Sequence, residues 1–331
     1  MKNIYLISIL LLFLSFILTY IIRLITLHHK ILDIPNERSS HTVPTPRGGG
    51  LAFVVTWYLG ISILFYFDSI DNHLYFALLC GLLLSGISII DDLLDIKPFI
   101  RLFIQVLTAI LACIFLNGIN PISISGLVIA SKYLLYPLVI IGIVWFINLY
   151  NFLDGIDGYA SLEAIIILFV MFFFTGNSIC LILIAPVTGF LFWNWPKAKI
   201  FMGDIGSTQL GFILIVLGIY FHDKTELSII NWIMLSSLFW FDATLTLFRR
   251  WRNKEKITVA HKKHAYQRAV QAGLSHQQTV LISFVINLFI IGLVFITRFY
   301  EFLIIPMFLI NMLFLYGITK LIDKKIPFRE V

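Results

Sequence analysis

Long apolar runs separated by short polar segments repeat along the whole chain. A helix that crosses a bilayer needs about 20 mostly apolar residues, within a range of about 17–25. Runs that meet or approach this length lie at 4–27, 49–67, 74–90, 99–116, 134–150, 158–175, 178–193, 208–221, 228–248, 278–297 and 302–322. The pattern predicts an all-α fold, a polytopic membrane helix bundle of about 11 transmembrane helices, in a single domain over residues 1–331.

Composition supports this class. Hydrophobic residues make up 60% of the 331 positions and charged residues only 13%, whereas soluble domains carry about 25% charged residues. Three cysteines, Cys80, Cys113 and Cys180, all lie in apolar stretches. They therefore predict neither a disulfide framework nor a zinc site.

The basic residues fall mainly in the loops on one side of the predicted membrane. That side holds 20 of the 24 Lys and Arg residues, and the other holds only Lys2, Lys132, Lys224 and Arg298. The positive-inside rule then places the N-terminus outside and the C-terminus in the cytoplasm. The net charge of +6 reflects this topology, so we expect no nucleic-acid partner. The predicted cytoplasmic loops, which would form the active face, are 28–48, 91–98, 151–157, 194–207 and 249–277.

Acidic residues gather at the cytoplasmic ends of the predicted helices, which is the main functional signal. Asp91 and Asp92 end an apolar run, where they repel each other and the negative end of the helix. A divalent cation or a cationic partner would relieve this conflict, although a solvated turn also explains the pair. Asp204 lies between Gly203 and Gly206 just before a span. That setting is typical of a phosphate site and also of an ordinary N-cap.

A polar stripe lies at the junction of two predicted spans, where Asn148, Asn151, Asp154 and Asp157 recur every three residues. In a helix this spacing would place them on one face. Polar residues at such a position are costly unless they line a cavity or bind a ligand. A polar turn with two glycines is the alternative, and we favour the binding site.

The largest cytoplasmic loop is also the most basic. Its residues His261, His264 and Arg268 are spaced to share one face of a helix, which Gly273 would end. Ser275 would then cap the next helix. Two histidines at this spacing suit zinc, but no third ligand is near, so anion binding is favoured.

The loop at 36–50 is rich in proline and glycine. Backbone amides in such a loop can cradle phosphate, and His41 and Arg47 lie among them. A plain linker is the alternative. Two acids inside predicted spans, Glu163 and Asp242, are candidates for structural partners of a cytoplasmic arginine.

Together, these segments bring carboxylates, glycine loops and basic residues to one membrane face. Carboxylate oxygens hold Mg²⁺, which in turn binds phosphates. The predicted chemistry is phosphoryl transfer, in which positioning and charge neutralisation supply most of the catalysis.

In this order, the motifs resemble those of the polyprenyl-phosphate N-acetylhexosamine-1-phosphate transferases, a family of the bacterial glycosyltransferase family 4 type. Its members initiate O-antigen, common antigen, teichoic acid and peptidoglycan lipid intermediates. The resemblance implies transfer of a sugar 1-phosphate from a UDP-N-acetyl-sugar to undecaprenyl phosphate, with release of UMP. It also implies Mg²⁺, or Mn²⁺ in its place, and a multi-pass protein of the bacterial inner membrane with a cytoplasmic active site. A homodimer is compatible with it.

The resemblance also carries roles to individual residues. Asp91 and Asp92 match the paired catalytic aspartates, which handle the lipid phosphate and the metal. Asp204 matches the Mg²⁺-binding aspartate, with Asp92 beside it, and Phe201 matches the aromatic residue that stacks on uracil. The other substrate-binding candidates are His41, Arg47, Asn151, Asp154, Asp157, His261, His264 and Arg268.

Two departures narrow the substrate. The peptidoglycan branch has a lysine where this chain has Asp95, and its triple-histidine loop is absent here. These differences argue against a UDP-MurNAc-pentapeptide donor. The His-x-x-His-x-Tyr-Gln-Arg run resembles the O-antigen branch, which uses UDP-GlcNAc or 6-deoxy-N-acetylhexosamine donors.

Two other classes remain as alternatives. A transporter would place polar residues near the middle of the membrane in broken helices, whereas these acids gather at one face. A CDP-alcohol phosphotransferase would need an Asp-Gly-x-x-Ala-Arg run, and no arginine follows Ala160 in that way.

Overall fold

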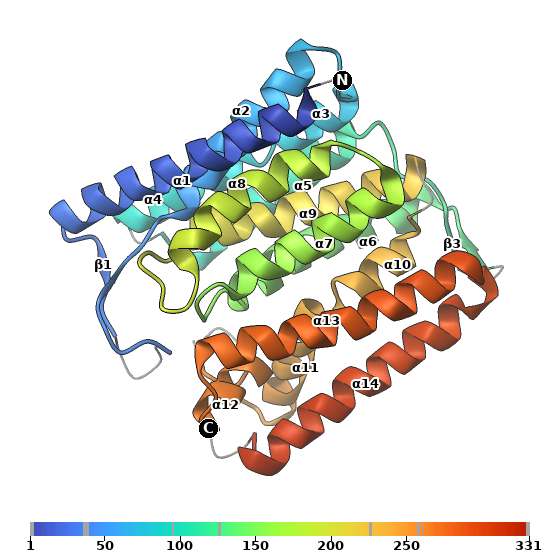
Figure 1. Cartoon of the computed structure of the whole chain (residues 1–331). Helices are drawn as coiled ribbons and strands as arrows, with labels where there is room; N and C mark the ends of the chain where they lie inside the picture. The colour runs from blue at the N-terminus through green and yellow to red at the C-terminus, as the bar shows by residue number, and fades with distance from the viewer. Residues whose placement is uncertain are drawn as a thin grey trace.

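The computed structural model of the chain describes residues 3–35, 40–94, 96–124, 127–224, 227–256, 259 and 261–328. This part is mostly helical, with two short strand pairs that the apolar pattern did not predict (Figure 1). The elements in order are α1 (Ile4–His28), β1 (Leu32–Asp33), β2 (Thr45–Pro46), α2 (Gly50–Tyr66), α3 (Asn72–Leu79), α4 (Leu82–Leu94), α5 (Pro98–Phe115), β3 (Ile122–Ile124), β4 (Leu127–Ile129), α6 (Lys132–Phe152), α7 (Tyr159–Thr175), α8 (Ile179–Asn194), α9 (Asp204–Lys224), α10 (Ile229–Leu235), α11 (Ser237–Arg252), α12 (Ala265–Gln271), α13 (His276–Phe299), the 3₁₀ turn η1 (Glu301–Leu303) and α14 (Ile304–Lys325).

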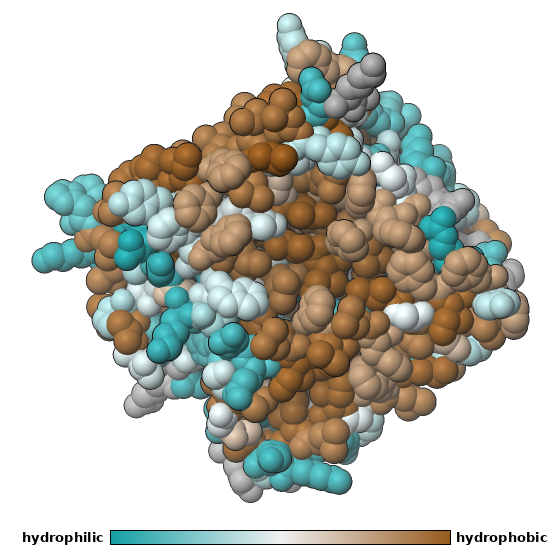
Figure 2. Space-filling model, in the orientation of Figure 1, coloured by the Kyte–Doolittle hydropathy of each residue, from teal (hydrophilic) through white to brown (hydrophobic). Residues whose placement is uncertain are grey.

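The helix α9 forms the centre of the bundle. Of its apolar stretch 89% is buried, against 22% for both α1 and α14. It packs against α2, α4 and α6, while α1 covers α8 and α2. The pair α13 and α14 lies along one edge (Figure 1). Figure 2 shows the result, a broad apolar band across the visible face with hydrophilic residues at its two ends.

The mostly helical membrane bundle confirms the coarse prediction. In the described chain, seven helices are long and apolar enough to cross a membrane, or eight if the bent pair α10 and α11 is one span. The apolar helices α2, α7 and α8 are shorter, at 16 or 17 residues. The total of about 11 spans and the orientation of the termini therefore stay predictions.

The ninth predicted run is broken, because α10 and α11 meet at an angle of 74°. A break inside a bilayer is tolerated only where other groups bind the freed backbone atoms. Trp240 Nε1 donates to the carbonyl oxygen of Ile233 at 2.7 Å, and Asn311 of α14 donates to the hydroxyl of Ser237 at 2.8 Å. The Ser236 hydroxyl donates back to the helix that it ends.

The first turns of α2 and α9 approach each other through glycines. The backbone N–H of Gly50 donates to the carbonyl oxygen of Met202 at 2.9 Å. A Cβ atom on Gly50 would lie 2.6 Å from the Cα atom of Gly206. Because that neighbour is backbone, it cannot move aside as a flexible side chain could. The close approach fixes the loops that precede both helices.

We therefore expect Gly50→Ala to separate α2 from α9, with a cost of about 1–3 kcal/mol, typical of overpacking. The unfolding temperature in detergent should fall. Gly86→Ala in α4 is the matched control, since no heavy atom lies within 4 Å of a Cβ there. Replacing a helical glycine with alanine should leave the protein as stable or stabilise it by up to about 1 kcal/mol. Equal unfolding temperatures for both variants would contradict the assigned contact.

Candidate active site

A cavity of about 450 Å³ lies where the loops at one end of the bundle meet. This end carries β1 and α12, on the left in Figure 1. The cavity is lined by Asp33, Ser40, His41, Arg47, Asn151, Asp154, Gly155, Ile156, Asp157, Asn194, Phe201, Met202, Gly203, Asp204, Gln267 and His276. Among them are the sequence-predicted residues His41, Arg47, Asn151, Asp154, Asp157, Phe201 and Asp204. The structure thus brings most of the candidate set together.

One wall is built by backbone pairing between the segments that precede α2 and α9. The N–H of Phe201 donates to the carbonyl oxygen of Pro46 at 2.8 Å, and the N–H of Gly49 donates to that of Phe201 at 2.9 Å. Arg47 is therefore held close to Phe201. The ring of His41 meets that of Phe201 edge to face, with centroids 4.8 Å apart. A half-buried aromatic wall of this kind suits a planar ring in the ligand.

The opposite wall is the loop between α6 and α7. The helix α6 ends at Phe152, so Asn151 is helical while Asp154 and Asp157 lie in the loop. The segment is therefore not helical throughout, and the four polar residues do not share one helical face. Gly158, with φ of +73°, takes a left-handed conformation that starts α7. The turn still directs both carboxylates to the cavity.

Four carboxylates, those of Asp33, Asp154, Asp157 and Asp204, line this single cavity. Burial, with the charges of Asp204 and Asp157 added, raises the pKa of Asp154 well above its usual value of 3.8. Asp157 accepts a hydrogen bond from the N–H of Ala198 at 3.1 Å, which fixes its side chain in the wall. Such crowding favours a bound cation, which would remove the repulsion.

The predicted catalytic residue Asp91 lies beside this cluster and is paired with Arg101 of α5. Arg101 Nη1 lies 2.7 Å from Asp91 Oδ2 and 3.6 Å from Asp204 Oδ2. The backbone N–H of Ile96 also donates to Asp91 at 2.8 Å. Arg101 thus joins two predicted acidic motifs. The side chain of Asp92, predicted to be catalytic and metal-binding, lies outside the described part of the structure, as does Asp95.

The donor set fits Mg²⁺ better than a metal that needs several protein ligands. In the described residues, no group of three or more His, Cys, Asp or Glu side chains converges on a metal position. Mg²⁺ usually takes one or two carboxylates and completes its shell with water and substrate phosphates. Asp204, at the rim of the cavity, could hold it in that way.

Sequence reasoning missed several residues of the cavity. Asn194 ties two walls together, since its side chain accepts from the N–H of Gly158 at 3.0 Å and donates to the carbonyl oxygen of Ile200 at 3.1 Å. His276 lies beside Asp157. Arg101 and His276 are polar residues near the first turns of long apolar helices, and a charge at such a position is a signal that could have found them.

The basic loop departs from the prediction. The helix α12 begins only at Ala265, so His261, His264 and Arg268 do not share one helical face. Its start is set by Asp242, whose carboxylate accepts from the N–H of Ala265 at 2.9 Å. The expected end near Gly273, at φ of +101°, and the Ser275 capping box are confirmed.

Arg268 is turned into the protein, and it does not line the cavity. Its side chain is 1% exposed, and Nη1 donates to Asp323 at 2.6 Å and to the carbonyl oxygen of Ile326 at 3.1 Å. Arg249 binds the same carboxylate, and the Phe328 ring packs on both guanidinium groups. These contacts account for Arg268 as an internal anchor of α12 to α14, so its predicted phosphate contact is not favoured.

The two histidines also lie away from the cavity lining. Burial, together with nearby positive charge, lowers the pKa of both His261 and His264 to about 3. They are therefore neutral at physiological pH, and a neutral ring offers phosphate only one N–H donor. Gln267 is the residue of α12 that reaches the cavity.

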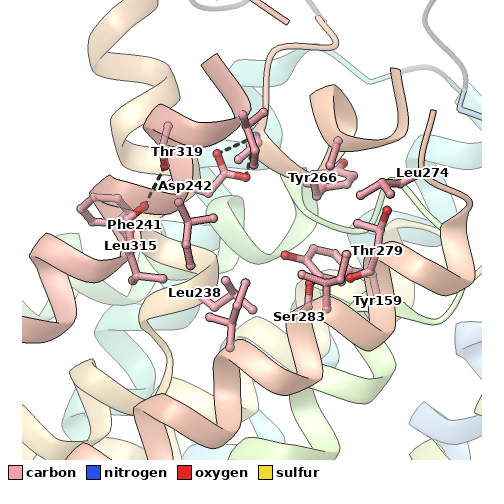
Figure 3. Close-up of a pocket in the computed structure, with 16 residues that line it drawn as sticks. Tyr159, Leu238, Phe241, Asp242, Tyr266, Leu274, Thr279, Ser283, Leu315 and Thr319 are labelled. Carbon is pink, nitrogen blue, oxygen red and sulfur yellow. Dashed lines mark hydrogen bonds between the residues drawn. The ribbon is translucent and has the colours of Figure 1, made fainter. Parts of the chain in front are cut away.

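A second, smaller cavity of about 70 Å³ lies between α7, α11, α12, α13 and α14 (Figure 3). Its lining is mostly apolar. Asp242 contributes a carboxylate, and Tyr159 and Tyr266 lie together at one side. Tyr266 lies between the two cavities, since it lines the smaller one and contacts Gly155 of the larger one. Its hydroxyl donates to the carbonyl oxygen of Phe152 at 3.1 Å. Its ring packs against Gly155, where no Cβ would fit.

Comparison with known proteins agrees with this architecture. Residues 74–222 match the model of glycosyl transferase family 4. Over 333 residues, covering 95% of this chain and 92% of the relative, the chain is 31% identical to a probable undecaprenyl-phosphate N-acetylglucosaminyl 1-phosphate transferase of Bacillus subtilis. It is 26% identical over 292 residues to a decaprenyl-phosphate N-acetylglucosaminephosphotransferase of Mycobacterium leprae, covering 75% of the chain and 72% of the relative. A phospho-N-acetylmuramoyl-pentapeptide-transferase of Streptococcus thermophilus is 31% identical over 211 residues, or 56% of the chain and 62% of the relative.

A multi-pass helical bundle with an acidic cavity at one end, together with these matches, defines the class as a membrane sugar-phosphate transferase. The chain belongs to glycosyl transferase family 4, since its similarity to the Bacillus subtilis relative extends over nearly all of both chains.

The contacts of Arg268 lead to a prediction that separates two roles for this residue, an internal anchor of α12 and a ligand of phosphate. Arg268→Lys keeps the charge but cannot bind Asp323, Ile326 and Lys263 at once. We expect a lower unfolding temperature, corresponding to about 3–5 kcal/mol at most, the range for a broken buried pair.

A double-mutant cycle with Asp323→Asn should show strong non-additivity, because the two residues share one contact. Lys324→Gln, one residue along α14 and exposed, is the control and should leave stability unchanged. Unchanged stability with weaker substrate binding in Arg268→Lys would show that Arg268 contacts a substrate phosphate instead.

Proposed function

We propose that this protein transfers N-acetylhexosamine 1-phosphate from a UDP-sugar to undecaprenyl phosphate, giving undecaprenyl-diphosphate-sugar and UMP, at the cytoplasmic face of a bacterial inner membrane. The observation that carries the proposal is the composition of the 450 Å³ cavity. It combines an aromatic wall, an arginine and a carboxylate cluster, which are the groups that a nucleoside diphosphate with a divalent cation needs. The relatives' names point to the same donor and acceptor classes.

The chemistry of these walls supports one orientation for the donor. Phe201, supported by His41, would face the uracil ring, and Arg47 would bind the diphosphate, as a planar guanidinium does well. Mg²⁺, or Mn²⁺, held by Asp204 with Asp92, would neutralise the diphosphate when bound. Asn151, Asp154 and Asp157 would contact the sugar and order the loop beneath it.

The acceptor phosphate would enter beside Asp91 and Arg101. Arg101 can bind an anionic phosphate without leaving Asp91, because a guanidinium has five N–H donors. An acceptor oxygen then attacks the phosphorus next to the sugar, the bond from that phosphorus to the bridging oxygen breaks, and UMP leaves with that oxygen. Asp91 or Asp92 is the proposed base for a remaining acceptor proton. The exchange replaces one diphosphate bond with another, so it should be nearly balanced.

N-acetylglucosamine is the first sugar to test, because two relatives carry it in their names. A 6-deoxy-N-acetylhexosamine is the second sugar to test, because the His-x-x-His-x-Tyr-Gln-Arg run of the basic loop resembles the O-antigen branch. The proposed product would initiate a cell-surface polysaccharide, for which O-antigen of lipopolysaccharide remains our proposal from the same motif.

The bond that is cleaved can be tested directly. UDP-N-acetylglucosamine labelled in the phosphate next to the sugar should deliver its label to the lipid fraction, with one UMP released per label transferred. Added UMP should drive the label back into the nucleotide-sugar, because the reaction conserves a diphosphate bond. Label in released UDP would show cleavage at the sugar carbon and refute the mechanism.

The metal proposal predicts the effect of Asp204→Asn, which keeps the shape of the side chain and removes its charge. Activity should fall by a factor of 100 or more, on the order of one transition-state charge contact, and higher Mg²⁺ or Mn²⁺ should restore part of it. Asp68→Asn, an exposed residue at the far end of α2, is the control. A near-normal rate with unchanged metal dependence in Asp204→Asn would exclude the assignment.

A further inference from the structure

His276, the first residue of α13, lies between two segments of the cavity wall. Its Nδ1 atom is 3.2 Å from Asp157 Oδ2, and its Nε2 atom is 3.1 Å from the carbonyl oxygen of Ser40. The N–H of Asp157 also points to Nδ1, at 3.5 Å. The carboxylate contact is the shorter and involves a charge, so it decides the protonation of that nitrogen.

Both ring nitrogens therefore face oxygen acceptors. A neutral imidazole has only one N–H, whereas the imidazolium has two. The charged ring donates to both oxygens at once, with Asp157 as its counter-ion, whereas a neutral ring that donates to Ser40 would turn a lone pair toward the Asp157 carboxylate. A charge-assisted hydrogen bond of this kind is about twice as strong as a neutral one.

The surroundings decide what the bridge can hold in place. Asp157 is 8% exposed, and it is tied on its other side to Ala198. Ser40 also lines the cavity, and it directly precedes residues 41–47, of which His41 and Arg47 line the same cavity. The charged or titratable groups that line the cavity around the bridge are Asp33, His41, Arg47, Asp154 and Asp204.

We propose that His276 is a positioning residue for the nucleotide-sugar: as an imidazolium it ties Ser40 to Asp157 and so sets the distance between the wall of His41 and Arg47 and the acidic loop. This inference rests on the proposed function for the identity of the ligand. The bridge acts on donor binding, because it joins the two donor walls and makes no contact with Asp91 or Arg101.

The bridge through His276 should weaken as pH rises. The charged ring is present below the ordinary histidine pKa of about 6.5, and Asp157 extends its range upward by favouring the charged form. As pH rises further the ring loses one N–H and one of its two contacts. The KM for the donor should then increase with pH, and the KM for the polyprenyl phosphate should not follow it.

His276→Gln tests this assignment, because an uncharged amide can donate to one wall at most. We expect the KM for UDP-N-acetylglucosamine to rise on the order of tenfold, the effect of one lost charged hydrogen bond, and its dependence on pH to flatten. The kcat value and the acceptor KM should stay within about twofold. Asp157→Asn should also flatten the pH dependence of the donor KM, and adding His276→Gln to it should change that dependence no further. His29→Gln, exposed near the same end of the bundle, is the control.

A second measurement needs no substrate. The three native cysteines are buried, so a cysteine placed at Thr45, which is 8% exposed, reports the opening of the wall through its labelling by a maleimide. His276→Gln should accelerate labelling of Thr45→Cys, and His29→Gln should not. Faster labelling in a protein that fails to release UMP from any UDP-sugar would keep the bridge and overturn the proposed function. Unchanged labelling, or a donor KM with the wild-type pH profile, would overturn the role of His276.

Discussion

The cavity depends on a close contact between two backbones, at Gly50 of α2 and Gly206 of α9. Because neither residue has a side chain, the segments before both helices can pair through their peptide groups, at Gly49, Phe201 and Pro46. A central helix that is almost wholly buried thus carries one wall of the cavity on its first turn. The positions of Phe201 and Asp204 therefore follow from the packing of α2 against α9, and a rigid loop is not required to hold them.

Charge is the second organising feature of the same end of the bundle. Four carboxylates share the cavity with Arg47, and two further basic side chains at this end are paired with carboxylates, Arg101 with Asp91 and His276 with Asp157. The arrangement leaves the centre negative and the rim mixed. A dianionic diphosphate would bind more readily there with a cation of its own, and Mg²⁺ is a cation that usually binds through one or two carboxylates together with substrate phosphates.

The helical bundle, the gathering of acids at one end and most of the cavity could be predicted from the sequence. These features depend on the lengths of apolar runs and on the positions of polar residues beside them, which are visible without knowledge of distant contacts. Gly273 and Ser275 were placed correctly for the same reason. The errors involve distant partners. The start of α12 is set by Asp242, 23 residues earlier, and Arg268 is held by Asp323, 55 residues later. Arg101 and His276 looked like isolated polar residues, since their partners are found only after folding.

The bond between Asp157 and His276 joins positions 119 residues apart, and this separation has a consequence for biogenesis. At about 5–20 residues per second, a ribosome needs roughly 6–24 s to proceed from one to the other. During that time the acidic loop has been made and its partner has not. The emerging chain therefore holds an incomplete cavity until α13 inserts, so the donor-binding walls reach their final geometry late in synthesis.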